Sequence, residues 1–239
     1  MSQHEILNPA DHGTLRVRTE ASAALGDNVM ACLTVPAEFR AVQAHYPIVF
    51  RRDGETGKLA ALALFGFDSG ENLFLAGDSW DALYKPLALA VQPFLIGRPA
   101  NDDDVPQVHV DRGHARISTS GEGVRVFDDS GQPTPYLEAI ASKLGDLDFA
   151  WRASDGFFAT LERYDLIEPF SLDVTLDNGS QQSLVGFQTI NEDRLAALDG
   201  AALQSLQAQG HLTAIFMVLA SLSQFAALVA RMNARMAGG

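Results

Sequence analysis

Cysteine is almost absent from this chain, since Cys32 is the only one among 239 residues. A single thiol cannot close an internal disulfide, and it cannot supply the four ligands of a structural zinc or iron–sulfur site. No His or basic residue adjoins Cys32 in the sequence to lower the pKa of its thiol, so we interpret it as a small buried hydrophobe. The cysteine content favours a reducing compartment.

Basic residues are also scarce. Seventeen Lys and Arg stand against thirty Asp and Glu, which gives a formal net charge of -13. An acidic surface repels phosphate backbones, so nucleic acid is not an expected partner. A basic leader followed by an apolar run is missing at the start, MSQHEILNPADHG, and we therefore expect a cytoplasmic protein.

Long uncharged segments are rare, and residues 212–230 form a run of nineteen without a formal charge. Nineteen helical residues span roughly 28 Å, close to the thickness of a bilayer core. Polar residues interrupt the run, and its large apolar side chains recur at spacings of three and four. We expect a buried core helix, with membrane association as the less favoured alternative.

The first 130 residues carry β-favouring runs separated by Gly, Asp and Pro. These runs are residues 28–35, 46–51, 59–67 and 72–75. Between the second and third runs, Asp53, Gly54 and Gly57 predict a hairpin turn. Further along, Asp78 or Ser79 can cap a helix that Pro86 limits or bends.

From Pro135 the apolar spacing becomes helical. A hairpin is predicted around Asp177, Asn178 and Gly179, and helical segments follow to the C-terminus. The sequence thus predicts an α+β fold with a β-rich N-terminal half of short strands and hairpins. Its helical C-terminal half contains an inserted β-hairpin and a buried C-terminal helix. We expect a single domain over residues 1–239, with a β-rich subregion 1–130 and a mainly helical subregion 131–239; a homo-oligomer is left open.

Several segments follow one another along the chain in the order of a known pattern. They are HYPIVFR (45–51), ENLFL (71–75), WDALY (80–84), PFLIG (93–97), GQPTPYL (131–137), LIEPFSLDVTLDNG (166–179) and the stretch from NEDRL to LASL (191–222). Together they resemble the SapC family of bacterial proteins. The family name comes from a protein associated with antimicrobial-peptide resistance. The resemblance implies no reaction, cofactor or catalytic residue that transfers to positions of this chain.

Members of that family are often encoded beside flavin-dependent halogenases, TonB-dependent receptors and cupin-like oxygenases. The resemblance therefore implies a role in the uptake or modification of a peptide or natural product. A partnership with a halogenase or a TonB-dependent uptake system is an expectation from this association alone.

A short motif, His109-Val-Asp111 followed by His114, contains metal-ligating residue types. If residues 108–111 form a strand, His109 and Asp111 lie on one face, as in the His-x-Asp pair of iron and 2-oxoglutarate oxygenases. Either His114 or the distant His211 could then supply a third ligand for Fe(II). The alternative is that these are surface residues beside a polar turn.

Aromatic side chains with polar tips suggest a binding pocket. The candidate residues are His45, Tyr46, Trp80, Tyr84 and Tyr136, with His45 as the polar group. Packing in the core is the alternative for each aromatic.

These observations support three hypotheses. The leading one is a cytoplasmic binding or accessory protein for a peptide or modified amino-acid natural product, with an aromatic-lined pocket between the two halves of the chain. The second is a metal-dependent oxygenase or hydroxylase that uses the His-x-Asp site. The third is an envelope-associated protein docked through its C-terminal apolar helix.

Overall fold

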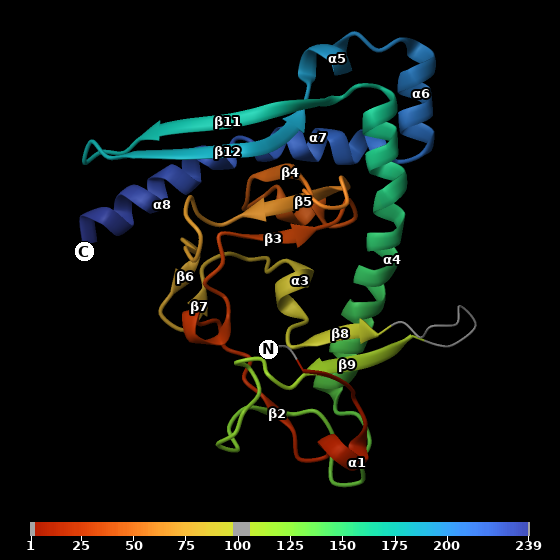
Figure 1. Ribbon diagram of the computed structural model, residues 1–239, viewed down its shortest axis with the longest axis vertical. Coiled ribbons are helices and arrows are strands. Elements are labelled where there is room, and N and C mark those ends of the chain that lie inside the picture. Colours follow the sequence, from red (N-terminus) through yellow and green to blue (C-terminus); the bar gives the residue numbers. More distant parts are fainter. Residues whose placement is uncertain (1–2, 98–105, 239) are drawn as a thin grey trace. The chain divides into compact units, whose positions relative to one another are not determined.

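Residues 3–97 and 106–238 are described by the computed structural model, and they fall into two units built from separate stretches of chain (Figure 1). The first unit comprises Met1–Asn28, Leu75–Asp81 and Leu87–Phe149. The second comprises Val29–Phe74, Ala82–Pro86 and Ala150–Gly239. The boundary between the units therefore does not follow the predicted subregions 1–130 and 131–239.

The order of elements confirms the α+β prediction. Short strands and small sheets occupy the N-terminal half, whereas helices predominate in the C-terminal half around one long hairpin (Figure 1). A helix closes the described chain, as the sequence predicts.

Among the described residues, the strands of the first unit form three small antiparallel sheets, with orders β1-β9-β8, β10-β2 and β6-β7. The strands are β1 (His4–Ile6), β2 (Arg16–Val17), β6 (Leu75–Ala76), β7 (Ser79–Trp80), β8 (Phe94–Gly97), β9 (Gln107–Asp111) and β10 (Val124–Arg125). The short helices are α1 (Pro9–His12), the 3-10 turn η1 (Ala23–Leu25) and α3 (Leu87–Ala90).

One apolar cluster forms the core of this unit. It contains residues from the strands of the unit and from the first turns of helix α4 (Pro135–Arg163). Its buried members are Leu15, Val17, Val91, Phe94, Val110, Val126, Phe127, Leu137, Ile140 and Leu144. A fully buried side chain of this size contributes about 1.5–3 kcal/mol. Because the strands here have only two to five residues, this packing stabilises the unit more than the strand ladders do.

The prediction of a helix that begins at Asp78 or Ser79 is wrong. Ser79–Trp80 is strand β7, and the next helix is the short α3. Gly77 has a φ of +61°, and the Ser79 hydroxyl donates to the carbonyl of Ala76 at 2.7 Å. The polar residues that could cap a helix instead close the turn of the β6–β7 hairpin.

The second unit is built on one antiparallel sheet of order β11-β12-β4-β5-β3. Its strands are β3 (Ala31–Thr34), β4 (Ile48–Arg52), β5 (Leu59–Leu64), β11 (Ile167–Thr175) and β12 (Gln181–Ile190). Both predicted hairpins are confirmed. Asp53 Oδ1 accepts from the Thr56 N–H at 2.7 Å in the β4–β5 turn, and Gly179 has a φ of +83° in the β11–β12 turn.

The helices of this unit follow from local caps. Asn191 accepts from the Arg194 N–H at the start of α5, and Asp199 accepts from the Ala202 N–H at the start of α6. The helices are α2 (Phe39–Val42), the second part of α4, α5 (Glu192–Ala196), α6 (Gly200–Ala208), α7 (His211–Ser221) and α8 (Gln224–Gly238). Helix α4 is one continuous helix of 29 residues, in the region where the apolar spacing becomes helical from Pro135.

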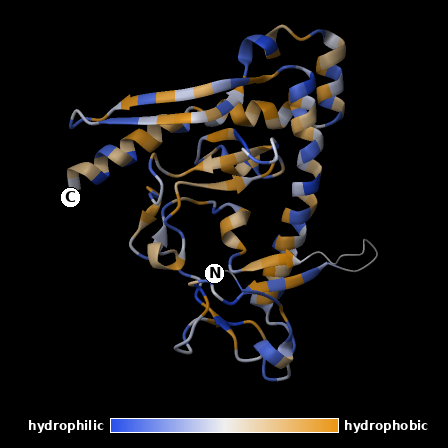
Figure 2. Cartoon of the chain, in the orientation of Figure 1, coloured by the Kyte–Doolittle hydropathy of each residue, from blue (hydrophilic) through white to orange (hydrophobic). Residues whose placement is uncertain are grey.

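Helix α8 packs against hairpin β11–β12. Polar and apolar residues alternate in β11 from Phe170 to Thr175, and both strands carry hydrophobic and hydrophilic residues in Figure 2. The ring of Phe170 stacks on Phe225 with centroids 5.2 Å apart, and Leu228 and Met232 are also buried. At the hairpin tip, the Asp177 N–H donates to Asn233 Oδ1 at 3.0 Å.

Within the described part of the chain, His211–Gly238 is long and apolar enough to cross a membrane by length and composition alone. A turn at residues 222–223 divides this stretch into α7 and α8, and a third of its most apolar window is buried. A helix packed in a protein core passes the same test, so the stretch is weak evidence for a membrane span.

Candidate functional site

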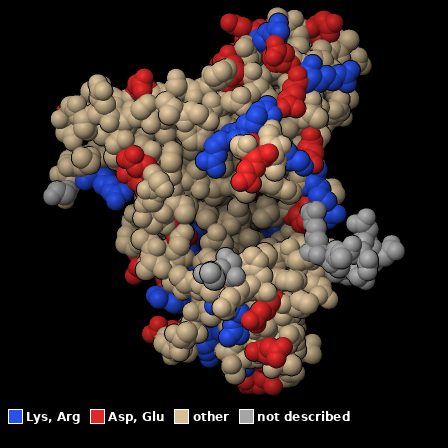
Figure 3. Space-filling model, viewed as in Figure 1, with Lys and Arg blue, Asp and Glu red and all other residues tan. Residues whose placement is uncertain are grey.

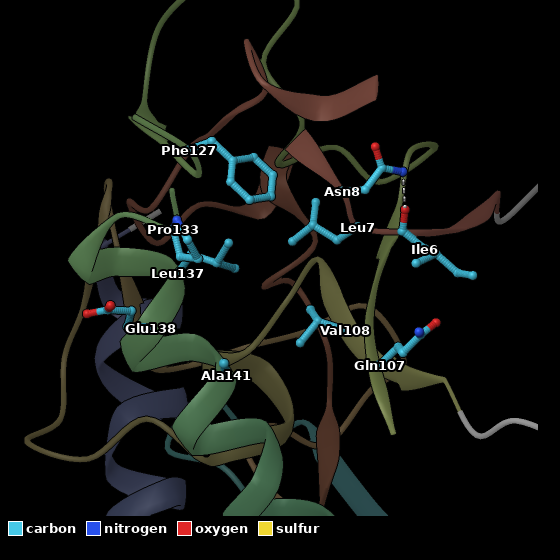
Figure 4. A pocket seen from close by; sticks show the side chains of 10 residues that line it. All are labelled: Ile6, Leu7, Asn8, Gln107, Val108, Phe127, Pro133, Leu137, Glu138 and Ala141. Carbon is cyan, nitrogen blue, oxygen red and sulfur yellow. Dashed lines mark hydrogen bonds between the residues drawn. The ribbon is translucent and has the colours of Figure 1, made fainter. Parts of the chain in front are cut away.

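A cavity of about 480 Å³ opens in the first unit beside β1, β9 and the first turns of α4 (Figure 4). Most of its lining is apolar. The lining residues are Ile6, Leu7, Asn8, Gln107, Val108, Phe127, Pro133, Leu137, Glu138 and Ala141. Their side chains surround an open space at the surface of the unit's apolar core.

Strand β1 and the turn after it fix one wall of the cavity. The Leu7 N–H donates to the carbonyl of Val108 at 2.9 Å, which ties the end of β1 to β9. Asn8 then caps α1, because its Oδ1 accepts from the Asp11 N–H at 2.9 Å. The Asn8 Nδ2 also donates to the carbonyl of Ile6 at 3.3 Å. These bonds hold the three consecutive lining residues in place.

Helix α4 forms the opposite wall. The Thr134 hydroxyl donates to the carbonyl of Arg125 at 2.8 Å, which anchors the chain just before the helix begins. Leu137 and Ala141 are four residues apart and therefore lie on one face of the helix. Figure 4 shows the carboxylate of Glu138 turned away from the cavity, so its aliphatic stem contributes to the wall.

This lining suits binding of an apolar group. Besides its apolar residues the lining includes two residues with amide side chains, Asn8 and Gln107, and the stem of Glu138, whose carboxylate lies outside the cavity. Ligand sites of this kind are mostly apolar, with a few polar groups that orient the ligand. Small-molecule pockets have volumes of about 300–1,000 Å³, and this cavity lies in that range.

The candidates His45 and Tyr46 lie in the second unit. Tyr46 has no exposed surface, and its ring packs edge-on against Phe74 and Phe65 with centroids 4.7 and 5.0 Å away. Its hydroxyl donates to the carbonyl of Tyr84. The His45 ring lies 5.8 Å from the Tyr46 ring. Tyr46 is therefore a core residue with its hydroxyl satisfied, which is the alternative given above for each aromatic.

Tyr84 also belongs to the second unit. Its hydroxyl donates to Glu38 Oε1 at 2.7 Å, and Glu38 is buried. Burial raises the pKa of the Tyr84 hydroxyl, and the hydrogen bond to Glu38 raises it further. Cys32 is buried, as predicted, and burial together with the nearby charge of Glu38 raises the pKa of its thiol. A thiol in this state is a poor nucleophile.

Trp80 and Tyr136 lie in the first unit. Trp80 pairs with Leu75 in the β6–β7 hairpin. Tyr136 is in the first turn of α4 and packs against Phe94, with ring centroids 6.3 Å apart. Neither residue lines the cavity, and none of the other three aromatic-pocket candidates does.

The three metal candidates have separate partners. The ring of His109 lies over Gly97, where an added Cβ would come within 1.9 Å of His109 Nε2. Asp111 Oδ1 accepts from the N–H groups of Gln3 and Gly113. His114 Nδ1 accepts from the Arg116 N–H at 3.1 Å. In residues 3–97 and 106–238, no group of three or more His, Cys, Asp and Glu side chains is arranged to hold a metal ion.

His211, the other proposed third ligand, lies in the second unit. It begins α7, and its ring packs edge-on against Phe157 at 5.6 Å. Burial lowers the pKa of its imidazole.

Sequence reasoning missed every residue of the cavity. Ile6, Leu7 and Asn8 belong to a three-residue strand and its turn, and such a strand has no periodicity to detect. Val108 was expected in a strand, but its partner β1 lies about a hundred residues earlier in the chain. The hydroxyl-capped helix start at Thr134 was the one usable local signal.

Comparison with protein families identifies the family of this chain. The family model SapC matches residues 7–228, which include most of the cavity lining and parts of both units. Searches of the curated proteins and of the solved structures found no match. The matched range covers most of the 239 residues, and the chain belongs to the SapC family.

Proposed function

We propose that this protein is a cytoplasmic binding or accessory protein that takes up an apolar group of a peptide or modified amino acid. The observation that carries the proposal is the apolar cavity beside β1, β9 and α4. The location differs from the aromatic pocket expected from sequence, whereas the class of ligand stays the same.

The chemistry of the lining supports binding rather than a reaction at this place. Its single ionisable residue is Glu138, and acid–base or nucleophilic catalysis requires at least one further group in reach of the reacting atoms. Apolar walls instead lower the free energy of an apolar ligand by about 25 cal/mol for each Å² removed from water.

The fixed geometry of the walls also supports the proposal. Leu137 and Phe127 are members of the buried core cluster, and Leu7 and Val108 pack against it. A cavity whose walls are held by a core loses little conformational entropy when a ligand enters. Binding can therefore proceed without reorganisation of the unit.

A neutral fluorescent probe tests the proposal. N-phenyl-1-naphthylamine should bind the purified protein with an increase in emission, because its quantum yield rises in apolar surroundings. Ala141→Phe places a ring in the cavity and should abolish the increase. Ala139→Phe makes the same substitution at an exposed position of α4 that does not line the cavity, and it should bind the probe as the wild type does.

Circular dichroism and thermal unfolding must show that both variants are folded. Equal probe binding by wild type and Ala141→Phe, or no binding by the wild type, would refute the cavity as the ligand site. Native mass spectrometry of untagged protein would then show whether a ligand is bound elsewhere.

A further inference from the structure

The outer edge of β1 lies beside the cavity and has backbone groups directed away from its sheet. In the described sheet β1-β9-β8, β1 is an edge strand that pairs with β9 on one side, and all three of its residues are exposed. No described strand pairs with its other side. Ile6, its last residue, lines the cavity.

The register shows which backbone groups face outward. The Leu7 N–H donates to Val108, and the Arg112 N–H donates to Gln3, both at 2.9 Å. Residues 3, 5 and 7 therefore direct their hydrogen-bonding groups to β9, since these groups alternate in an antiparallel pair. His4 and Ile6 direct theirs to the opposite side, where a further strand can pair, although the Ile6 carbonyl already accepts from Asn8 Nδ2 at 3.3 Å.

Carboxylates lie near the outer edge of β1 and the cavity. Glu138 belongs to the cavity lining, and Asp11 Oδ2 accepts from Asn8 Nδ2 at 2.9 Å. The chain as a whole has a formal net charge of -13. Figure 3 shows both basic and acidic side chains on the face in view. These charges favour a basic ligand over an acidic one.

From this arrangement we infer that the ligand is an extended basic peptide, which adds as a strand to the outer edge of β1 and inserts one apolar side chain into the cavity. Main-chain hydrogen bonds to both backbone groups of His4 and to the N–H of Ile6 supply affinity, and the cavity selects the side chain. The inference rests on the proposed function, because it uses the same cavity, and it adds the edge of β1 and the chemical class of the partner.

A peptide pool and one pair of variants test the edge separately from the cavity. The pool consists of acetylated pentapeptide amides with Lys at both ends, Val or Thr at the second and fourth positions, and Leu, Ile or Phe at the centre. His4→Pro removes an outward N–H, whereas the sheet bonds to β9 and the cavity lining stay as they are. His4→Ala is the matched control, because it removes the side chain and keeps the N–H.

We expect the pool to bind the wild type and His4→Ala equally by native mass spectrometry. His4→Pro should bind it about tenfold more weakly, through one lost hydrogen bond and the clash of the ring with an added strand. Binding of N-phenyl-1-naphthylamine should not change in His4→Pro. Hydrogen exchange of the His4 and Ile6 amides should slow when the pool is bound to the wild type.

The outcomes separate the two proposals. If the fluorescent probe binds but the pool does not, or if His4→Pro binds the pool as tightly as His4→Ala, strand addition is refuted and the cavity stands. If neither the probe nor the pool binds the wild type, the proposed function fails as well. Should His4→Pro not fold, a pool methylated on the backbone nitrogens of its second and fourth residues replaces it, and wild-type binding equal to that of the unmethylated pool would refute the inference.

Discussion

Arg116 and Asp27 form an ion pair in the interior of the first unit, with Nη2 and Oδ2 2.5 Å apart and at most 3% of either side chain exposed. Arg116 Nη1 also donates to the carbonyls of Arg18 and Glu20, and the Ser22 N–H donates to Asp27 Oδ2. The pair connects loops that have almost no regular secondary structure.

Removing one partner of this pair should destabilise the protein strongly. Asp27→Asn leaves a buried guanidinium without its counter-charge, and we expect a loss of about 3–5 kcal/mol in the free energy of unfolding. Urea unfolding followed by circular dichroism measures it. The matched control is Glu162→Gln, which breaks the exposed pair with Arg52 and should cost less than about 1 kcal/mol. Equal losses would show that burial does not determine the strength of these pairs.

The bond between Tyr84 and Glu38 should contribute to the stability of the second unit. Tyr84→Phe removes a donor to a buried carboxylate, and the expected cost is about 1–3 kcal/mol in the free energy of unfolding. Tyr164→Phe is the control, because the ring of Tyr164 contacts Arg163 and no described hydrogen bond involves its hydroxyl. A smaller loss for Tyr84→Phe than for Tyr164→Phe would contradict the structure.

Stability should fall as the pH falls below about 6.5, in part because of His114. Burial lowers the pKa of the His114 imidazole, and the positive charge of Arg116 lowers it further. Below the unfolded-state pKa, near 6.5, the unfolded chain binds a proton that the folded state resists. The stability that His114 contributes is therefore complete above that pH and is lost as the pH falls through the folded-state pKa.

Nuclear magnetic resonance titration of the His114 ring measures this pKa directly. A midpoint at or above 6.5 would contradict the assignment. Among the other histidines, burial also lowers the pKa of His211, so a stability measurement must compare the wild type with His114→Gln to isolate the contribution of His114.

His109 and Gly97 should be energetically coupled. Gly97→Ala brings a methyl group against the His109 ring and should destabilise the wild type by about 1–3 kcal/mol through overpacking. In a His109→Ala background the same substitution should cost much less, since the ring is gone. Additive effects in this double-mutant cycle would show that the ring does not lie over Gly97.

The His109→Ala variant also tests the oxygenase hypothesis. We expect the Fe(II) content of protein purified without a histidine tag, under metal-replete and anaerobic conditions, to be far below stoichiometric and unchanged by His109→Ala. Near-stoichiometric iron that disappears in His109→Ala would support the His-x-Asp site.

Local chemistry accounts for the parts of the fold that the sequence predicts correctly. Asp53 and Gly179 each define a turn by their own side chain or backbone, so both hairpins are visible without tertiary information. Asp78 and Ser79 show the limit of this reasoning. Residues that suit a helix cap also suit a tight turn, and the pairing of β6 with β7 decides between them.

The cavity could not be predicted, for a related reason. Ile6 and Val108 are adjacent only because β1 pairs with β9, and the three residues of β1 are too few to show a pattern in the sequence. Tyr46 shows the converse error. An aromatic with a polar tip suggested a pocket wall, whereas a backbone carbonyl satisfies the hydroxyl inside the core.

The strand order of the second unit constrains how this protein is made. β4 pairs with β12, and Phe225 of α8 stacks on Phe170 of β11. During synthesis, strands β3 to β5 leave the ribosome long before β12 exists, and the hairpin emerges before α8. The strand edge of β4 and the apolar side chains of the hairpin are therefore exposed on the nascent chain until β12 and α8 have emerged, a situation that favours aggregation and makes assistance by chaperones an expected part of its biogenesis.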